Sequence, residues 1–333
     1  MRICLACILL LPSGLCAQSS NHLRFAPTTF SPVFSLNREP ALTIRAGDTV
    51  RTETIDAMGF DQKGVHRAKG GNPLTGPFRV EGAMPGDVLA VQFLDVSLNR
   101  DYAYTSESFV SRSMPRETLS SLKKPRLVKW KLDRQNNWAL PDSALSHYPH
   151  LRNFKVTMNP FLGCIGVAPD NRKNEILSFF QGPFGGNLDY NRVRSGSTVY
   201  LPVFHEGAYL YIGDGHALQA DGELAGNALE TSMNVVFSVR LIKTYTPALQ
   251  YPRIEDGEYL MALGTASEIP DALKKASKNL LDWLQKDYAL SLQEATQVMS
   301  TNIEYSIAEI ADPEVVVVAK IRKSALEQIL HFQ

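Results

Sequence analysis

Polar side chains that could bind a metal or activate water are concentrated between residues 182 and 230. Glycines lie among them, and apolar runs rich in β-forming residues lie on either side. Because glycine accepts positive φ angles and close backbone approach, short carboxylate and imidazole side chains on such turns can converge on one point. The pattern therefore predicts a metal or substrate pocket on a β scaffold. Its members are Asn187, Asp189, Asp214, His216, Gln219, Asp221, Glu223 and Glu230.

The predicted metal ligands in this stretch are Asp214 and His216, which are two residues apart. On a regular strand this spacing points both side chains to the same face. Zinc binds such a mixture of imidazole and carboxylate while leaving an open position for water. Asp56, in the N-terminal part of the chain, is the third predicted ligand, and Asp189 is a further candidate. The alternative is structural, since Asp-Gly pairs are common turn formers.

Other residues could move protons or hold a substrate. Glu81 lies next to apolar Val80, and burial there would raise the pKa of its carboxyl and make it a proton shuttle. The alternative is a solvated position at the end of a strand. Asn187 could donate to a developing oxyanion, although a turn role is equally open. Glu230 could hold a ligand or a substrate nitrogen. We therefore expect Glu81 and His216 to be catalytic, and Asn187 and Glu230 to bind substrate with Asp189.

Cys164 offers a second chemistry. A thiolate at this position, with His216 as base, would form a covalent intermediate without a metal. However, the cysteine lies in an apolar stretch, and free cysteine is among the most buried residue types. A buried structural role is therefore the favoured interpretation of Cys164.

Several motifs occur in order along the chain and cover most of it. They are Gly-Gly-Asn-x-Asp at residues 185–189, Ser-Gly-Ser-Thr-x-Tyr-Leu-Pro-Val at 195–203, and Gly-Asp-x-His-x-x-Gln-x-Asp-Gly-Glu at 213–223, with upstream blocks at 73–77, 80–89 and 160–169. Together these motifs resemble the acetamidase/formamidase family. The resemblance implies a β-rich body with a smaller second unit, hydrolysis of simple amides, and an oligomer.

One position departs from the family pattern. Members commonly carry a histidine directly before the Gly-Gly-Asn-x-Asp block, whereas this chain has Phe184. Loss of an imidazole there would remove a ligand or a hydrogen bond to the substrate. We therefore expect Phe184 to line a more apolar substrate pocket that favours a bulkier amide.

The N-terminus has the layout of a secretory signal peptide over residues 1–17. One arginine precedes an apolar run at residues 3–11, which is too short to cross a membrane, and small residues follow. We expect cleavage after Ala17 and export to the periplasm or the medium. Cys16 suggests a lipoprotein instead, but Leu15 occupies the position where a small residue is usual. Cys164 is then the one cysteine of the mature chain, so no internal disulfide can form.

The composition of the chain limits the classes of molecule that the protein is expected to bind. The chain has 34 basic and 34 acidic residues, a balance that argues against nucleic acid or an anionic membrane surface. Beyond the N-terminus, no segment approaches the roughly 20 apolar residues of a membrane span. A small neutral molecule is the better partner.

Local patterns predict a β-rich α+β fold with a β-sandwich or barrel body and a smaller C-terminal α+β unit. Strands are expected at residues 88–93 and 235–240, and a buried strand at 315–319. The strand at 235–240 is expected to be half-buried, with Val235, Phe237 and Val239 on its inward face. Helices are expected to begin at Pro270 and at Ser291, where Glu294 completes a capping box. We divide the mature chain into β-rich segments at 18–150 and 151–246 and an α+β segment at 247–333.

These observations predict an exported amidohydrolase that converts a linear carboxamide into ammonia and a carboxylate. The amide is formamide-like, acetamide-like or bulkier. Water activated by a divalent metal, with zinc the first expectation, is the predicted nucleophile, and a homo-oligomer is the predicted assembly. The alternative is a catalytically inactive protein that binds a small ligand, which Phe184 would favour.

Overall fold

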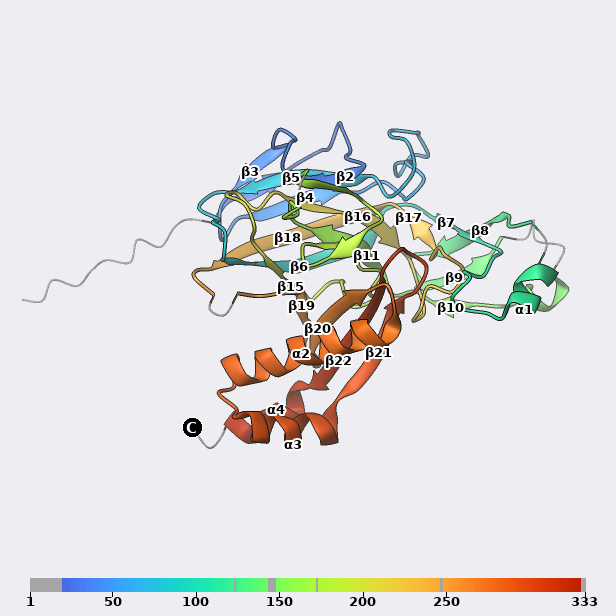
Figure 1. Cartoon of the computed structure of the whole chain (residues 1–333). Coiled ribbons are helices and arrows are strands. Elements are labelled where there is room, and N and C mark those ends of the chain that lie inside the picture. The colour runs from blue at the N-terminus through green and yellow to red at the C-terminus, as the bar shows by residue number, and fades with distance from the viewer. Residues whose placement is uncertain (1–19, 123, 143–147, 172, 246–247, 331–333) are drawn as a thin grey trace, which may run out of the picture.

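The computed structural model describes residues 20–122, 124–142, 148–171, 173–245 and 248–330. Figure 1 shows a β-rich body and a smaller unit of helices and strands formed by the C-terminal part of the chain, which confirms the predicted fold class. The predicted signal peptide and its cleavage site lie outside the described residues. Among the helices of the described ranges, none is both long and apolar enough to cross a membrane. The helices are α1 (Arg116–Ser121), the short 3₁₀ helix η1 (Pro149–Leu151), α2 (Ile269–Asp287), α3 (Leu292–Asn302) and α4 (Lys323–Leu330).

A nine-stranded sheet extends through both parts of the molecule. Its longest pairing joins β18 and β6, and the predicted inward face of β18 is confirmed because Val235, Phe237 and Val239 are all buried. In spatial order the strands are β1 (His22–Arg24), β4 (Thr49–Glu53), β18 (Met233–Ile242), β6 (Val88–Leu98), β15 (Thr198–Pro202), β19 (Arg253–Glu255), β20 (Tyr259–Ala266), β22 (Val315–Arg322) and β21 (Glu304–Glu309).

A second, eleven-stranded sheet carries the polar stretch singled out in the sequence. Its strand β16 pairs with β11, β17 and β5, so residues from four parts of the chain meet around it. The path runs β10 (Val156–Thr157), β9 (Trp138–Pro141), β8 (Leu127–Asp133), β7 (Tyr102–Ser106), β17 (Glu230–Thr231), β16 (Leu210–His216), β11 (Phe161–Gly166), β14 (Gly185–Asn187) and β13 (Gln181–Gly182), with β5 (Leu74–Val80) and β3 (Leu42–Ile44) beside it. A separate pair joins β12 (Glu175–Leu177) to β2 (Val33–Ser35).

The C-terminal unit has a hydrophobic core of its own between α2 and strands β20 and β22. Alanines 272 and 276 on the buried face of α2 lie so close to β20 that any side chain at Gly264 would collide with the helix backbone. The expected helix starts are confirmed: Pro270 lies in the first turn of α2, and Ser291 caps α3 through a capping box with Glu294. The predicted strand at residues 315–319 begins β22.

The three predicted segments share the nine-stranded sheet. Strand β4 from residues 18–150 pairs with β18 from residues 151–246, and β15 pairs with β19 from residues 247–333. Residues from distant parts of the sequence are therefore fixed to one framework, which allows a site to draw on all three.

Candidate active site

A buried imidazole at the end of β16 is surrounded by carboxylates. The Nε2 atom of His216 lies 3.4 Å from Asp214 Oδ1 and 3.3 Å from Glu230 Oε2. Its Nδ1 atom lies 3.8 Å from Asp189 Oδ1. All four side chains are buried. The sequence-based expectation that these residues meet in one place therefore agrees with the structure.

Strand pairing explains how the residues come together. Glu230 on β17 lies directly opposite His216 on β16. Asp189 follows β14, which is separated from β16 only by β11. On β11, Gly163 faces the group, and a Cβ atom there would lie 2.6 Å from Asp214 Oδ2 and 3.0 Å from His216 Cε1. Glycine is therefore required at this point of the sheet to leave room for the carboxylates.

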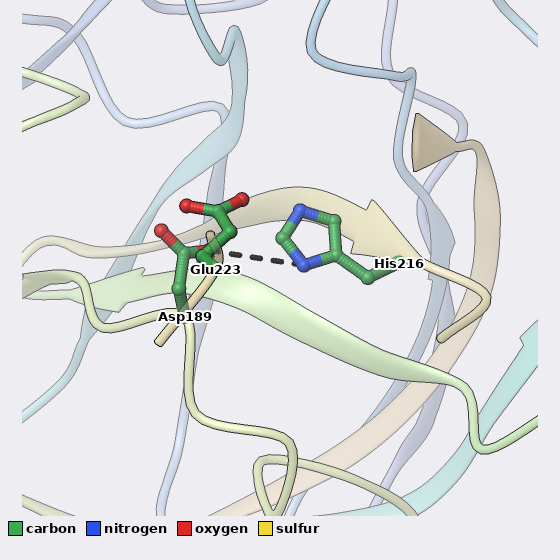
Figure 2. A group of neighbouring side chains, drawn as sticks. All are labelled: Asp189, His216 and Glu223. Carbon is green, nitrogen blue, oxygen red and sulfur yellow. Dashed lines mark ion pairs between the residues drawn. The ribbon is translucent and has the colours of Figure 1, made fainter. Parts of the chain in front are cut away.

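Glu223 is a further member of the group. One carboxylate oxygen each from Asp189 and Glu223 and one ring nitrogen of His216 lie within 4.8 Å of one another. Figure 2 shows both carboxylates on the same side of the imidazole ring. The sequence placed Glu223 at the end of the longest motif, but no local signal distinguished it from its neighbours. We call Asp189, Asp214, His216, Glu223 and Glu230 the His216 cluster.

Four buried polar atoms of the His216 cluster lack hydrogen-bond partners among the described residues. Within the described part of the chain, Asp189 Oδ1, Asp214 Oδ1, His216 Nδ1 and Glu230 Oε2 are buried and accept or donate no hydrogen bond. Each such group costs about 1–3 kcal/mol when left unpaired, so several together call for a ligand. Zinc bonds of about 2.0–2.1 Å place neighbouring tetrahedral ligands roughly 3.4 Å apart. The distances from His216 Nε2 to Asp214 and Glu230 match this spacing.

Electrostatics within the cluster favour bound protons or a cation. Burial opposes a charge on His216, but the carboxylates of Glu230 and Asp214 outweigh it and hold the pKa of the imidazole well above its ordinary value. Burial and mutual repulsion raise the pKa of Asp189 and Glu223 well above those of free carboxyls. Positive charge of some form is therefore needed to offset these acids.

Asn187 has no free donor for an oxyanion. Its Nδ2 atom donates to Asp189 Oδ2 and, over 2.8 Å, to Asp312 Oδ2. Its Oδ1 atom accepts from Asn72 Nδ2 at 3.1 Å and from the Cys164 thiol at 2.7 Å. The Asn187 amide therefore positions the carboxylates of Asp189 and Asp312. The predicted role of Asn187 in stabilising an oxyanion is not supported. Asn72 and Asp312 were not singled out from the sequence.

Cys164 is a buried thiol at the edge of the cluster. Burial and the nearby carboxylates, Asp214 first among them, raise its pKa well above the ordinary value. The thiol donates to Asn187 Oδ1 at 2.7 Å, with the carbonyl oxygen of Ser178 at 3.5 Å and Asp214 Oδ2 at 3.9 Å as further partners. Because the thiolate is the reactive form of cysteine, this environment disfavours a nucleophilic role, in agreement with the favoured interpretation.

Asp56 does not reach the His216 cluster. Its Oδ2 atom accepts from Arg100 Nη2 at 2.7 Å, and its Oδ1 atom accepts from the backbone amides of Met58 and Phe60. With both oxygens occupied, Asp56 is not placed as a metal ligand. Arg100 also donates to the backbone carbonyl of Glu230. The ion pair of Asp56 and Arg100 therefore helps to hold β17 in place.

Glu81 lies on the surface and not in the buried setting that was expected. It follows the end of β5 in a turn, and its carboxylate accepts from Arg45 Nε at 2.7 Å. The side chain is 44% exposed. The predicted proton shuttle depended on burial, so its physical basis is absent at this position.

Phe184 also lies apart from the cluster. Its ring packs against Phe34 with ring centroids 5.3 Å apart. It lines a separate cavity of about 600 Å³ together with Phe204 and Tyr251, and His216 is not among the residues around this cavity. The expected contact between Phe184 and a substrate held at the cluster is therefore not supported.

Comparison with known proteins identifies the class to which this fold and site belong. A sequence model of the Acetamidase/Formamidase family matches residues 35–177 and 183–327, and the chain therefore belongs to that family. Membership supports hydrolysis of amides. A formamidase of Methylophilus methylotrophus is 23% identical over 343 residues, covering 81% of this chain and 82% of the relative. A putative formamidase of Schizosaccharomyces pombe is 24% identical over 280 residues, covering 66% and 68%.

Solved structures share the fold. An acetamidase from Yersinia enterocolitica superposes with a TM-score of 0.79 and 26% identity, covering 93% of this chain and 94% of that one. An acetamidase from Bacillus halodurans gives a TM-score of 0.77 and 25% identity, covering 92% and 99%. The match extends through both the body and the C-terminal unit.

Proposed function

We propose that the protein is an exported amidohydrolase that converts a linear carboxamide into ammonia and a carboxylate at the His216 cluster. The observation that carries this proposal is the set of four buried polar atoms around His216 that have no hydrogen-bond partner within the described part of the chain. A neutral core would not retain such a group without a ligand. Family membership supplies the class of reaction.

Asp214, His216 and Glu230 are the residues that would hold a divalent cation. They offer two carboxylate oxygens, at 3.4 Å and 3.3 Å from His216 Nε2, and this spacing suits neighbouring zinc ligands. Three protein ligands leave a fourth position open, as in catalytic zinc sites. When bound, the cation lowers the pKa of water and polarises a carbonyl group. Zinc is our choice because it takes imidazole and carboxylate together.

The two remaining acids are Asp189, which orients the imidazole ring, and Glu223, which accepts a proton. Asp189 lies 3.8 Å from His216 Nδ1, where a small closure would let it accept the ring N–H and fix the ring orientation. Glu223 lies beside it and takes a proton from the attacking water. This role replaces the one predicted for Glu81. The water oxygen then bonds to the carbonyl carbon while the carbonyl electron pair moves to oxygen.

The enclosure of the cluster favours a small neutral amide. His216 is 1% exposed, and Asp214 and Glu230 are 2% and 3% exposed, which leaves little space for a large acyl group. Phe184 was the argument for a bulkier amide and for an inactive binding protein. Because its ring packs in the core, neither alternative has specific support from it.

Export and assembly are further parts of the proposal. The layout of residues 1–17 supports a cleaved signal peptide and therefore a periplasmic or secreted enzyme. The family resemblance supports a homo-oligomer. Sequencing the mature N-terminus and measuring mass in solution test these two points.

The central test combines metal analysis with ammonia release. Purified protein is assayed on formamide, acetamide, propionamide and butyramide before and after chelation and zinc return. We expect hydrolysis of the smallest amides, loss with chelator, and recovery with zinc. His216→Ala should lose both zinc and activity, whereas the surface variant Glu81→Gln should retain both. Metal-replete protein that hydrolyses no amide would refute the proposal.

A further inference from the structure

The C-terminal unit contributes a carboxylate to the active site. Figure 1 shows the connection between β21 and β22 running from the smaller unit towards the body, and its Asp312 bonds to Asn187 at the end of β14. At its tip, Asp312 Oδ2 accepts from Asn187 Nδ2 at 2.8 Å. Asn187 in turn contacts Asp189 of the His216 cluster. Asp312 thus lies one side chain away from the proposed catalytic residues, although 96 positions separate it from His216 in the sequence.

This connection is held rigidly. Arg112 donates to the carbonyl oxygens of Ile310, Asp312 and Pro313. The carboxylate of Glu309 accepts from the backbone amides of Ala311 and Asp312. A loop fixed from both sides in this way presents its side chain in one orientation, which is the condition for a functional group that must meet a substrate.

Asp312 differs from the cluster acids in its access to solvent. It is half-buried, whereas the cluster residues are buried. Within the described chain its second oxygen, Oδ1, has no hydrogen-bond partner that would occupy it. Burial is the main cause that raises the pKa of Asp312 to about 7, with Asp214 adding to it. The carboxyl therefore holds a proton for part of the time near neutral pH.

An amide cannot leave as an anion, so its nitrogen needs an acid. Glu223 lies next to Asp189, with a carboxylate oxygen within 4.8 Å of a ring nitrogen of His216. Asp312 shares a donor with the cluster, because Asn187 Nδ2 donates both to Asp189 and to Asp312 Oδ2, and the half-buried Asp312 lies at the edge of the cluster. We propose that Asp312 is a catalytic residue that binds the substrate nitrogen at this edge and protonates it as it leaves.

The step balances as follows. The tetrahedral adduct collapses, the bond between carbon and nitrogen breaks, and its electron pair stays on nitrogen. That nitrogen takes the proton from the Asp312 carboxyl and departs as ammonia. The carboxylic acid product then gives up its proton, which restores Asp312. Glu223 releases to solvent the proton that it took from water, where this proton converts ammonia into ammonium. This inference rests on the proposed amide hydrolysis.

The test compares two leaving groups in matched variants. A p-nitrophenyl ester with the same acyl group as the best amide has a leaving group that needs no proton. In Asp312→Asn we expect kcat/KM for the amide to fall by about 10²- to 10⁴-fold, the range of general acid catalysis. The ester value should stay within about threefold, and Asp312→Glu should recover part of the amide activity. The control is Asp271→Asn, which removes an exposed carboxylate on α2 of the same C-terminal unit.

Zinc content and thermal stability, measured for each variant, separate a folding defect from a catalytic one. Equal losses on amide and ester, or no loss on either, would overturn the role of Asp312 alone. Wild-type protein that releases ammonia from no amide would instead overturn the proposed function and, with it, this inference. A selective loss in Asp312→Asn supports both.

Discussion

A rise in pH should destabilise the metal-free protein through Glu309. This carboxyl is fully buried, and burial, with a smaller effect of Asp312, raises its pKa from 4.5 to about 8. The unfolded chain releases this proton near pH 4.5, but the native chain keeps it until about pH 8. The native state therefore binds the extra proton between these values, and its advantage is lost as pH rises.

The magnitude follows from proton linkage. One extra bound proton changes the free energy of unfolding by about 1.4 kcal/mol per pH unit, so Glu309 alone accounts for roughly 4 kcal/mol between pH 5 and pH 8. Asp312, with its pKa raised to about 7, changes stability in the same direction. The figure is an upper bound for Glu309, because Asp312 and Glu223 repel it and titrate with it.

Urea unfolding at pH 5, 6, 7 and 8 in the presence of chelator measures this dependence. The free energy of unfolding should fall steadily with pH in the wild type. In Glu309→Gln the free energy of unfolding should fall less steeply with pH, by as much as about 1.4 kcal/mol per pH unit, which corresponds to one proton. The two proteins should differ least in stability at pH 5. Identical slopes, or a wild-type stability that rises over this range, would refute the reasoning.

Four further variants test individual positions. Cys164→Ser should retain ammonia release, since a thiol held in its protonated form is no nucleophile; complete loss with an intact fold would favour the covalent route. Glu81→Gln should keep its kcat/KM within about twofold, as expected for a surface residue, and a large drop would reopen its role. Gly163→Ala should reduce zinc content because its Cβ would intrude on Asp214; normal zinc binding would contradict the geometry. Asp56→Ala should lower the free energy of unfolding by about 3–5 kcal/mol, because a buried guanidinium loses its partner; a change under 1 kcal/mol in urea would contradict this.

Much of the framework could be predicted because its patterns are local. Alternation along residues 235–239 predicted the inward face of β18, and the capping box at Ser291 predicted the start of α3. Strands β7, β8 and β9 were not predicted, because residues 102–149 show little periodic signal. Tertiary pairing holds these strands in the second sheet, and pairing of that kind leaves little mark on the local sequence.

The site was predicted where spacing or a motif linked its members, as for Asp214 and His216. It was not predicted where the partner lies far away. Asp56 is neutralised by Arg100, which is 44 residues away, and nothing beside Asp56 reveals this pairing. Asp312 meets Asn187 across 125 residues. Burial and long-range contacts determine which acidic residues belong to the candidate site. Neither property can be deduced from the neighbouring residues in the sequence.

The anchoring of Asp312 has a consequence for biosynthesis. Strands that support the imidazole are complete once residue 242 has been made, yet the acid proposed for the nitrogen arrives only with the final hairpin of β21 and β22. A chain that ends before this hairpin would contain His216 and the carboxylates around it but would lack the β21–β22 connection that carries Asp312. Catalytic competence is therefore gained only near the end of translation, when almost the whole polypeptide exists.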